Sequence, residues 1–226
     1  MFPIVGPTQQ TDFKIETPSG EAILDQHGIA RLINFELNQK TSQSLKYSRV
    51  YKENTNLNNP KASNNNSNPK EVFWPYNFEM NKTFNLTDEE LIIEFEIMCE
   101  EAMPYMFGYH PAFKLSGNKN EFVSISGNGF LSKSKNVSYN QIEQKENTAY
   151  QVKNISNSEL VRPDKELKIE IKTKGFNNMM FWTNHSSMLC VEPITHLPYP
   201  TTTTYFGNKI LGPKKYKVTI TPKKIQ

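Results

Sequence analysis

The sequence predicts an all-β protein, built as a sandwich or barrel of antiparallel strands. The first observation is an apolar alternation with a period of two, clearest in residues 91–97, where Ile93 and Phe95 share one face and Glu94 lies on the other. The second is that turn-forming residues separate many short runs of this kind. The third is that no segment of about 12 residues or more has convincing helical spacing. Many short strands with turns between them indicate a sandwich or barrel.

The apolar runs give the expected strands in chain order. They cover residues 13–16, 29–37, 73–80, 91–97, 122–125, 167–171, 179–183, 188–192 and 216–220. The polar residues 87–90 (Thr-Asp-Glu-Glu) lie between two of these runs, and they favour a turn that sends one strand back along the next.

One long segment belongs to no expected core. Residues 52–69 (KENTNLNNPKASNNNSNP) contain no aromatic residue and almost nothing apolar, which is typical of a long, mobile polar loop. A linker between two domains is the alternative, although the residues before it are too few for an independent β-domain. Because an all-β domain can run to about 250 residues, the 226 residues are expected to form one domain, 1–226.

Composition argues against several classes of protein. The 26 Lys and Arg residues against 23 Asp and Glu give a net charge of +3, and their even distribution argues against a nucleic-acid binder. No apolar run of about 18 residues predicts a membrane span, and the N-terminal MFPIVGPTQQ lacks the pattern of a signal peptide. The two cysteines, Cys99 and Cys190, are interpreted as reduced, buried thiols of a cytoplasmic protein.

His110 is the histidine whose context most favours a function. The chain has four histidines: His27, His110, His185 and His196. His110 lies in GYHPAF among aromatic residues, and Pro111 biases it towards an extended backbone. A titratable imidazole in a rigid, partly apolar setting can act as a general acid. A surface or hydrogen-bonded structural histidine is the alternative.

Glu192 is the matching candidate for a general base. It follows the hydrophobic residues 188–191 and precedes Pro193. A carboxylate at the end of a buried strand costs free energy unless it is paired or functional, and partial desolvation would raise its pKa towards the working pH. The alternative is an exposed glutamate at a strand end.

His27 and Arg31 are expected to project together, because residues four apart on an extended strand face the same side. They could then donate to hydroxyls or to a phosphate, and arginine suits bidentate recognition of anions. A half-exposed polar strand face is the alternative. Metal-binding, nucleotide-binding and GxSxG motifs are absent from the sequence, so no metal or cofactor is expected.

Six motifs occur in the order seen in aldose 1-epimerases, which the chain resembles over nearly its whole length. They are FPIVGP (2–7), HGIAR (27–31), WPYNFEM (74–80), MPYMFGYHPAF (103–113), FWT (181–183) and CVEP (190–193). The closest resemblance is to the LacX-like and hexose-6-phosphate 1-epimerase-like branch, in which HGFAR and GxHPAF motifs recur.

The resemblance implies a galactose-mutarotase-like β-supersandwich with a sugar cleft on the concave face of a large antiparallel sheet. It also implies interconversion of the α and β anomers of a sugar or sugar phosphate, without a cofactor. By match to the family's motifs, His110 would protonate the ring oxygen and Glu192 would remove the proton of the C1 hydroxyl. His27 would bind the ring or a hydroxyl, and Arg31 would contact hydroxyls or a phosphate. Trp182 would offer the sugar an apolar surface or belong to the core.

The chain departs from the family's pattern in three places. Relatives usually carry further residues before the FPIVG motif, so the expected sandwich lacks its first N-terminal strands or is naturally reduced. Many relatives have a sugar-binding arginine where Pro7 stands, and Trp and Gly where this chain has Ile194 and Thr195. Two functions therefore stay open: an aldose or hexose-phosphate 1-epimerase, or a non-catalytic carbohydrate-binding or sugar-sensing protein on the same scaffold.

Overall fold

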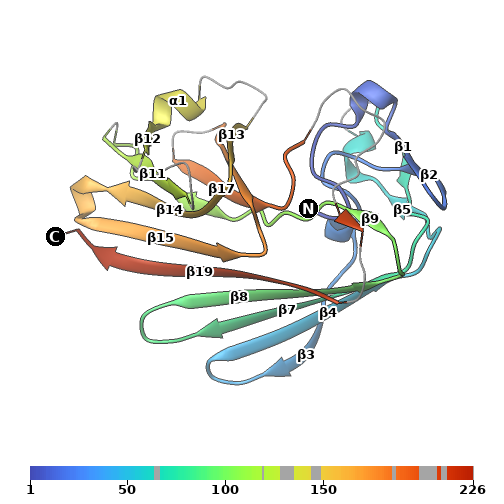
Figure 1. Cartoon of the computed structure of the whole chain (residues 1–226), viewed down its shortest axis with the longest axis horizontal. Coiled ribbons are helices and arrows are strands. Elements are labelled where there is room, and N and C mark those ends of the chain that lie inside the picture. The colour runs from blue at the N-terminus through green and yellow to red at the C-terminus, as the bar shows by residue number, and fades with distance from the viewer. Residues whose placement is uncertain are drawn as a thin grey trace.

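A nine-stranded antiparallel sheet forms the larger layer of the structure, which is a computed structural model (Figure 1). In spatial order its strands are β12 (Lys135–Ser138), β11 (Phe122–Gly127), β14 (Ile155–Arg162), β15 (Leu167–Lys174), β19 (Lys214–Lys224), β8 (Leu91–Cys99), β7 (Phe78–Leu86), β4 (Ser44–Tyr51) and β3 (Glu36–Lys40). The C-terminal strand β19 therefore lies between four strands from the first half of the chain and four from the second half.

A four-stranded sheet packs against the β11–β14–β15 end of the larger sheet (Figure 1). Its strands, in spatial order, are β10 (Ala112–Lys114), β17 (Met188–Ile194), β16 (Asn178–Trp182) and β13 (Tyr150–Lys153). Three two-stranded sheets complete the strands: β1 (Lys14–Thr17) with β2 (Gly20–Ile23), β5 (Leu57–Asn58) with β6 (Glu71–Val72), and β9 (Pro104–Tyr105) with β18 (Asn208–Lys209). The helices are short: η1 (Gln9–Thr11), η2 (Ala30–Leu32), η3 (Pro60–Ser63), α1 (Tyr139–Glu143) and η4 (Pro163–Lys165).

The structure describes residues 1–63, 67–118, 120–127, 135–143, 149–184, 187–198, 208–209 and 213–225. His185 and residues 64–66 of the polar segment lie outside this set. Among the described residues, no helix is long and apolar enough to cross a membrane.

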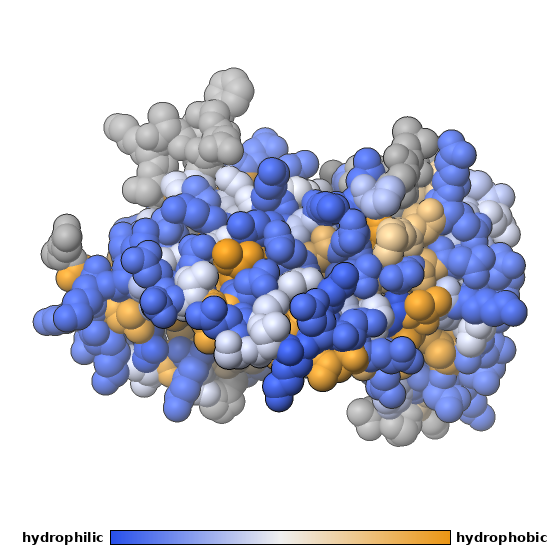
Figure 2. Space-filling model, turned by 90° about the horizontal axis from the view of Figure 1, so that it is seen from below, coloured by the Kyte–Doolittle hydropathy of each residue, from blue (hydrophilic) through white to orange (hydrophobic). Residues whose placement is uncertain are grey.

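The core lies between the sheets, on the apolar face that strand alternation creates. Ile93, Phe95 and Ile97 of β8 are buried, and Tyr216 and Val218 of the neighbouring β19 are buried beside them. Burying one such side chain stabilises the fold by about 1.5–3 kcal/mol. The intervening residues face outwards. The face seen from below the view of Figure 1 is mostly hydrophilic, with hydrophobic side chains in separate groups (Figure 2).

The all-β prediction is confirmed, as are most of the predicted strands. The runs at 91–97, 122–125, 167–171, 179–183, 188–192 and 216–220 all lie in strands, and 13–16 largely coincides with β1. Residues 87–90 form the predicted turn between β7 and β8, where the Thr87 side chain accepts the N–H of Glu90 at 3.0 Å.

Two strand predictions are wrong over most of their length. Residues 29–37 form η2 and irregular chain before β3 begins at Glu36, and residues 73–77 precede the start of β7 at Phe78. Each run mixes buried residues, such as Ile29 and Trp74, with exposed ones, such as Leu37 and Asn77, and an apolar run alone does not distinguish a strand from irregular chain.

The polar segment 52–69 is also more structured than its composition predicts. It contains β5 and η3, and Asn59 is buried, with its side chain donating to Pro69 O at 3.0 Å. Because asparagine bonds readily to nearby backbone, such segments can order without an apolar core of their own.

Candidate functional site

Strand register puts His110 opposite Glu192. Ala112 of β10 pairs with Cys190 of β17, and moving two residues back on one segment and two forward on the other leads to His110 and Glu192. An isolated bridge two residues further along keeps the same register. The two predicted functional residues, more than 80 positions apart in the chain, are therefore cross-strand neighbours.

Backbone hydrogen bonds flank this pair on both sides, and proline carbonyls accept them. Tyr109 N–H donates to Pro193 O at 3.0 Å, and Val191 N–H donates to Pro111 O at 3.1 Å. The pair between them is thus a non-hydrogen-bonded pair, the type in which facing residues lie closest, with Cα atoms about 4.5 Å apart. A proline has no N–H to donate but keeps its carbonyl, so the HP and EP dipeptides fit this arrangement.

His110 and Glu192 contact each other through their side chains. Nε2 of His110 lies 3.3 Å from Oε1 of Glu192, and the imidazole is 31% exposed whereas the carboxyl group is 4% exposed. Burial raises the pKa of Glu192 to about 8, and the nearby Met1 amino group opposes this shift. Burial also lowers the pKa of His110 below its ordinary value. The two groups can therefore share one proton near neutral pH, at a point that solvent reaches through the imidazole.

The FPIVGP motif connects the two histidine motifs. Phe2 N–H donates to His27 O at 3.2 Å, and Phe2 O accepts the N–H of Ala30 at 3.0 Å. On the other side, Gly108 N–H donates to Met1 O at 2.9 Å. The N-terminal segment thereby sets the position of the HGIAR turn relative to His110.

His27 and Arg31 lie together, as predicted, but not on a strand. A turn followed by η2 brings them together, and Arg31 Nη1 lies 3.3 Å from His27 Nδ1. The carboxylate of Asp25 accepts the backbone N–H of His27 at 2.9 Å and forms an ion pair with Arg31. The contact between His27 and Arg31 was therefore predicted correctly, but the strand from which it was predicted does not form.

His27 faces His110, with the ring centroids 5.4 Å apart and the planes nearly perpendicular. Burial first, and then neighbouring positive charges, lower the pKa of His27 to about 3, so its imidazole is neutral. Because the Arg31 guanidinium can only donate, Nδ1 of His27 accepts a hydrogen bond from it. The single N–H of the neutral imidazole is then on Nε2. That Nε2–H can donate to an oxygen of a bound molecule.

Trp182 borders the same face of the four-stranded sheet. It pairs with Cys190 across β16 and β17, is partly exposed, and its ring centroid lies 6.4 Å from that of His110. The five residues singled out from the sequence thus form two adjoining groups. One is the His110–Glu192 pair with Trp182 at its edge, and the other is His27 with Arg31.

Two residues near these groups were missed from the sequence, Asp25 and Cys190. Asp25 is 3% exposed and fixes both His27 and Arg31. A signal existed, because an Asx residue two positions before a Gly-containing turn favours this backbone bond. Cys190 lies two residues before Glu192 on the same strand face, as the period of two implies.

Cys190 also completes a set of side chains that could hold a metal ion. Ligand atoms of His110, Cys190 and Glu192 all lie within 4.8 Å of one another. Sulfur, nitrogen and carboxylate oxygen are ligands that Zn²⁺ accepts. A bound ion would occupy the lone pairs of His110 and Glu192, so it would compete with acid–base chemistry there.

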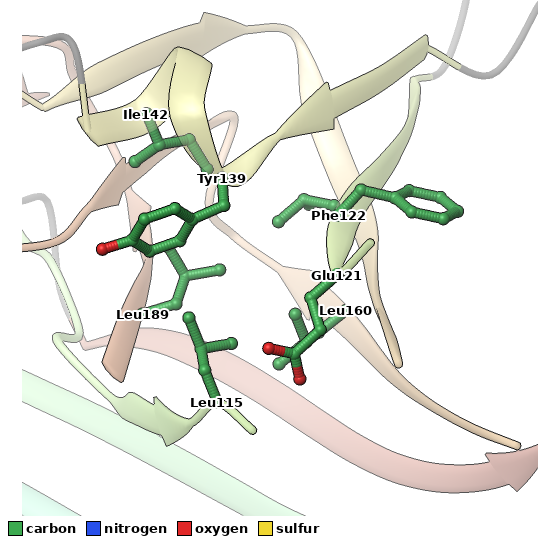
Figure 3. Close-up of a pocket in the computed structure, with 8 residues that line it drawn as sticks. Leu115, Glu121, Phe122, Tyr139, Ile142, Leu160 and Leu189 are labelled. Carbon is green, nitrogen blue, oxygen red and sulfur yellow. The ribbon is translucent and has the colours of Figure 1, made fainter. Parts of the chain in front are cut away.

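A separate pocket lies among α1, β11, β14 and β17 (Figure 3). Leu115, Leu160, Leu189 and neighbouring apolar side chains line it, together with Glu121. The Glu121 carboxylate accepts from Arg162 Nε at 2.8 Å and from a backbone N–H. Since the one charged group there is already paired, this pocket is less suited to chemistry than the His110–Glu192 pair.

Solved structures with the same fold support the architecture. A galactose mutarotase-like protein from Lactobacillus casei has a TM-score of 0.72 at 17% identity, covering 98% of this chain and 83% of its own. A galactose mutarotase related enzyme from Lactobacillus acidophilus gives 0.71 at 16%, covering 100% and 82%. Galactose 1-epimerase from the same species gives 0.62 at 11%, covering 99% and 79%. The predicted galactose-mutarotase-like fold is therefore confirmed.

The family follows from a sequence comparison. A search of curated proteins gives no match. The family model described as aldose 1-epimerase matches residues 10–216, a span that includes both facing histidines and Glu192. With most of its length matched and its strands arranged as in galactose mutarotase-like structures, the chain belongs to the aldose 1-epimerase family.

Proposed function

We propose that the protein is an aldose 1-epimerase, which interconverts the α and β anomers of a hexose or hexose 6-phosphate. The observation that carries the proposal is the contact between His110 Nε2 and Glu192 Oε1 at 3.3 Å. Ring opening needs an acid at the ring oxygen and a base at the C1 hydroxyl. Because these two oxygens are bonded to one carbon, the acid and the base must lie side by side.

The reaction follows from these positions. Glu192 takes the proton of the C1 hydroxyl as a carbonyl forms at C1, and the bond from C1 to the ring oxygen breaks while His110 protonates that oxygen. Rotation about the C1–C2 bond then presents the other face of the carbonyl. The C5 hydroxyl attacks it, His110 takes back the proton of that hydroxyl, and Glu192 returns its proton to the former carbonyl oxygen. His27 Nε2–H donates to a sugar oxygen and Trp182 flanks the ring.

The cycle needs one proton on the pair. The opening step needs that proton on the imidazole and the carboxylate free, and after opening the proton lies on the carboxyl group. Burial raises the pKa of Glu192 to about 8 and lowers that of His110, so one proton stays on the pair at neutral pH, where it rests on the carboxyl group and must pass to His110 before opening. No step needs a metal or cofactor.

The motifs support finer proposals about branch and location. HGIAR and GYHPAF favour the LacX-like and hexose-6-phosphate 1-epimerase-like branch, with Arg31 beside the sugar. Two free thiols, Cys99 and Cys190, favour the cytoplasm. The partner is then a small sugar or sugar phosphate, without nucleic acid or membrane.

The test is anomer exchange followed by NMR with freshly dissolved α-glucose, α-galactose and glucose 6-phosphate. The wild type should accelerate exchange of at least one of them, and Glu192→Gln and His110→Ala should lower kcat by at least about 100-fold, the lower end for general acid–base catalysis. His196→Ala, which changes a histidine outside the site, serves as the control and should keep full activity.

Two outcomes would reject the proposal. Full activity in both Glu192→Gln and His110→Ala would mean that this pair does no chemistry. Binding of a hexose without any exchange would favour the alternative, a carbohydrate-binding or sugar-sensing protein. The presence of Pro7 where many relatives have a sugar-binding arginine supports that alternative.

A further inference from the structure

Two cationic side chains, Arg49 of β4 and Lys82 of β7, lie on the core-facing side of the nine-stranded sheet. Arg49 is paired in register with Met80, which is buried in the core. Lys82 is two residues from Met80 on the same strand and therefore shares its face. Charged side chains are rare on such a face, because burial without a partner costs free energy.

Aromatic rings hold both cations in place. The Arg49 guanidinium carbon lies 3.3 Å from the ring centroid of Phe35. Lys82 Nζ lies 4.5 Å from the centroid of Phe84 and 4.8 Å from that of Tyr109. Ring faces attract a cation but use none of the hydrogens in the guanidinium plane, so these contacts position the charges and leave donors free.

Neither charge is neutralised by a carboxylate within the described part of the chain. Nε of Arg49 is buried and has no hydrogen-bond partner there. Burial lowers the pKa of Arg49 to about 10 and that of Lys82 to about 8, the direction expected for cations that lack a counter-ion. An anion between them would supply the missing partner for both.

The two cations lie near the chain segment that carries the proposed catalytic pair. Tyr109, which packs against Lys82, directly precedes His110 in the chain, and the two side chains point to opposite sides of this extended segment. The charges of Arg49, Lys82 and Glu192 all act on the same buried amino group of Met1, so the three lie around a common point. Arg31, the phosphate candidate from the sequence, already has Asp25 as its ion-pair partner.

We infer that Arg49 and Lys82 form a subsite for the phosphate group of an aldose phosphate, which makes a phosphorylated hexose the preferred substrate of the proposed epimerase. The inference rests on the proposed function for its catalytic consequence, though not for binding. Two cations match a phosphate dianion, and the guanidinium fork can bind two of its oxygens at once.

The experiment compares glucose 6-phosphate, glucuronate and glucose in the wild type, Lys82→Met and Arg49→Met. Methionine keeps much of the apolar volume of each side chain and removes the charge. Lys46→Met is the matched control, because Lys46 is exposed on the adjacent strand and faces the other side of the sheet. Binding is measured by calorimetry in the Glu192→Gln background, where no turnover interferes, and kcat/KM by anomer exchange. Thermal melts verify that each variant is folded.

The wild type should bind glucose 6-phosphate at least about tenfold more tightly than glucose, and each subsite variant should weaken that binding by about tenfold or more, as expected for a lost charge-assisted hydrogen bond. Binding of glucose and exchange of glucose should be unchanged, and Lys82→Arg should restore part of the preference.

Three results would overturn the inference. One is equal affinity for glucose and glucose 6-phosphate in the wild type, and another is unchanged phosphate preference in folded Lys82→Met and Arg49→Met. The third is tighter binding of glucuronate than of glucose 6-phosphate, which would assign the subsite to a carboxylate. Phosphate-dependent binding without any exchange would keep the subsite and reject only the proposed epimerase activity.

Discussion

The proton shared by His110 and Glu192 should confine the proposed activity to a range of pH. As pH rises through about 8, Glu192 loses the last proton of the pair, and no acid remains for the ring oxygen. As pH falls below the lowered pKa of His110, the pair takes up a second proton and no base remains. Anomer-exchange kcat/KM should therefore plateau near neutral pH and fall about tenfold per unit above pH 8. Activity that still rises between pH 8 and 10 would contradict this assignment.

The charged group that fixes His27 and Arg31 should contribute to stability as well. Asp25→Asn keeps the size of the side chain but leaves Arg31, which is 33% exposed, without its counter-ion. We expect the free energy of unfolding to fall by about 1–3 kcal/mol, the range for hydrogen bonds to charged groups. Urea denaturation measures it. Asp164→Asn is the control, because that carboxylate only approaches exposed Lys165, at 3.8 Å, and should change stability by less than about 1 kcal/mol.

The turn that carries the HGIAR motif depends on Gly28. Its φ is +65°, and a Cβ there would overlap the carbonyl of Phe2, which bonds to the same motif. Gly28→Ala should cost about 1–2 kcal/mol in backbone strain and about 1–3 kcal/mol more from the overlap. Gly117→Ala separates the two terms, since its φ is +82° but nothing lies within 4 Å of the added carbon.

Thermal and urea denaturation of Gly28→Ala and Gly117→Ala measure whether the overlap with Phe2 costs stability beyond the backbone strain. Equal losses of stability in both would show that the approach of Phe2 does not matter. A larger loss in Gly28→Ala, together with weaker sugar binding, is expected because the overlap would push the FPIVGP segment away from its hydrogen bonds to the HGIAR turn.

The stability of the whole molecule depends on an aromatic cluster that joins distant segments. The ring of Phe107 lies 4.8 Å from Tyr216, 5.1 Å from Phe95, 5.4 Å from Phe176 and 6.3 Å from Phe2, measured between centroids. Phe107→Ala should lower the free energy of unfolding by about 3–5 kcal/mol, because a cavity opens where four segments meet. Leu86→Ala, at a side chain that is 56% exposed, should change it by less than about 0.5 kcal/mol. A loss below about 1 kcal/mol for Phe107→Ala would show that the cluster repacks without it.

Strand alternation was sufficient to predict the core-facing side of β8, β15 and β19, because each of these strands has one buried and one solvent-facing side. It failed for residues 29–37 and 73–77, where buried and exposed residues do not alternate as they do in a strand. The same alternation also contained a signal that sequence reasoning missed. Lys82 stands in phase with the buried Met80, and that placement marks it as a charge on a core face.

The sequence by itself determined the residue types and local order of the candidate site: an imidazole and a carboxyl group, each followed by a proline, and a histidine four residues before an arginine. These are local properties, because backbone preference and side-chain chemistry act over a few residues. Tertiary structure alone decided that His110 faces Glu192 and that Lys82 packs against Tyr109. Contacts of this kind depend on the register between strands that are distant in the chain, and one sequence specifies that register only through the packing of the complete core.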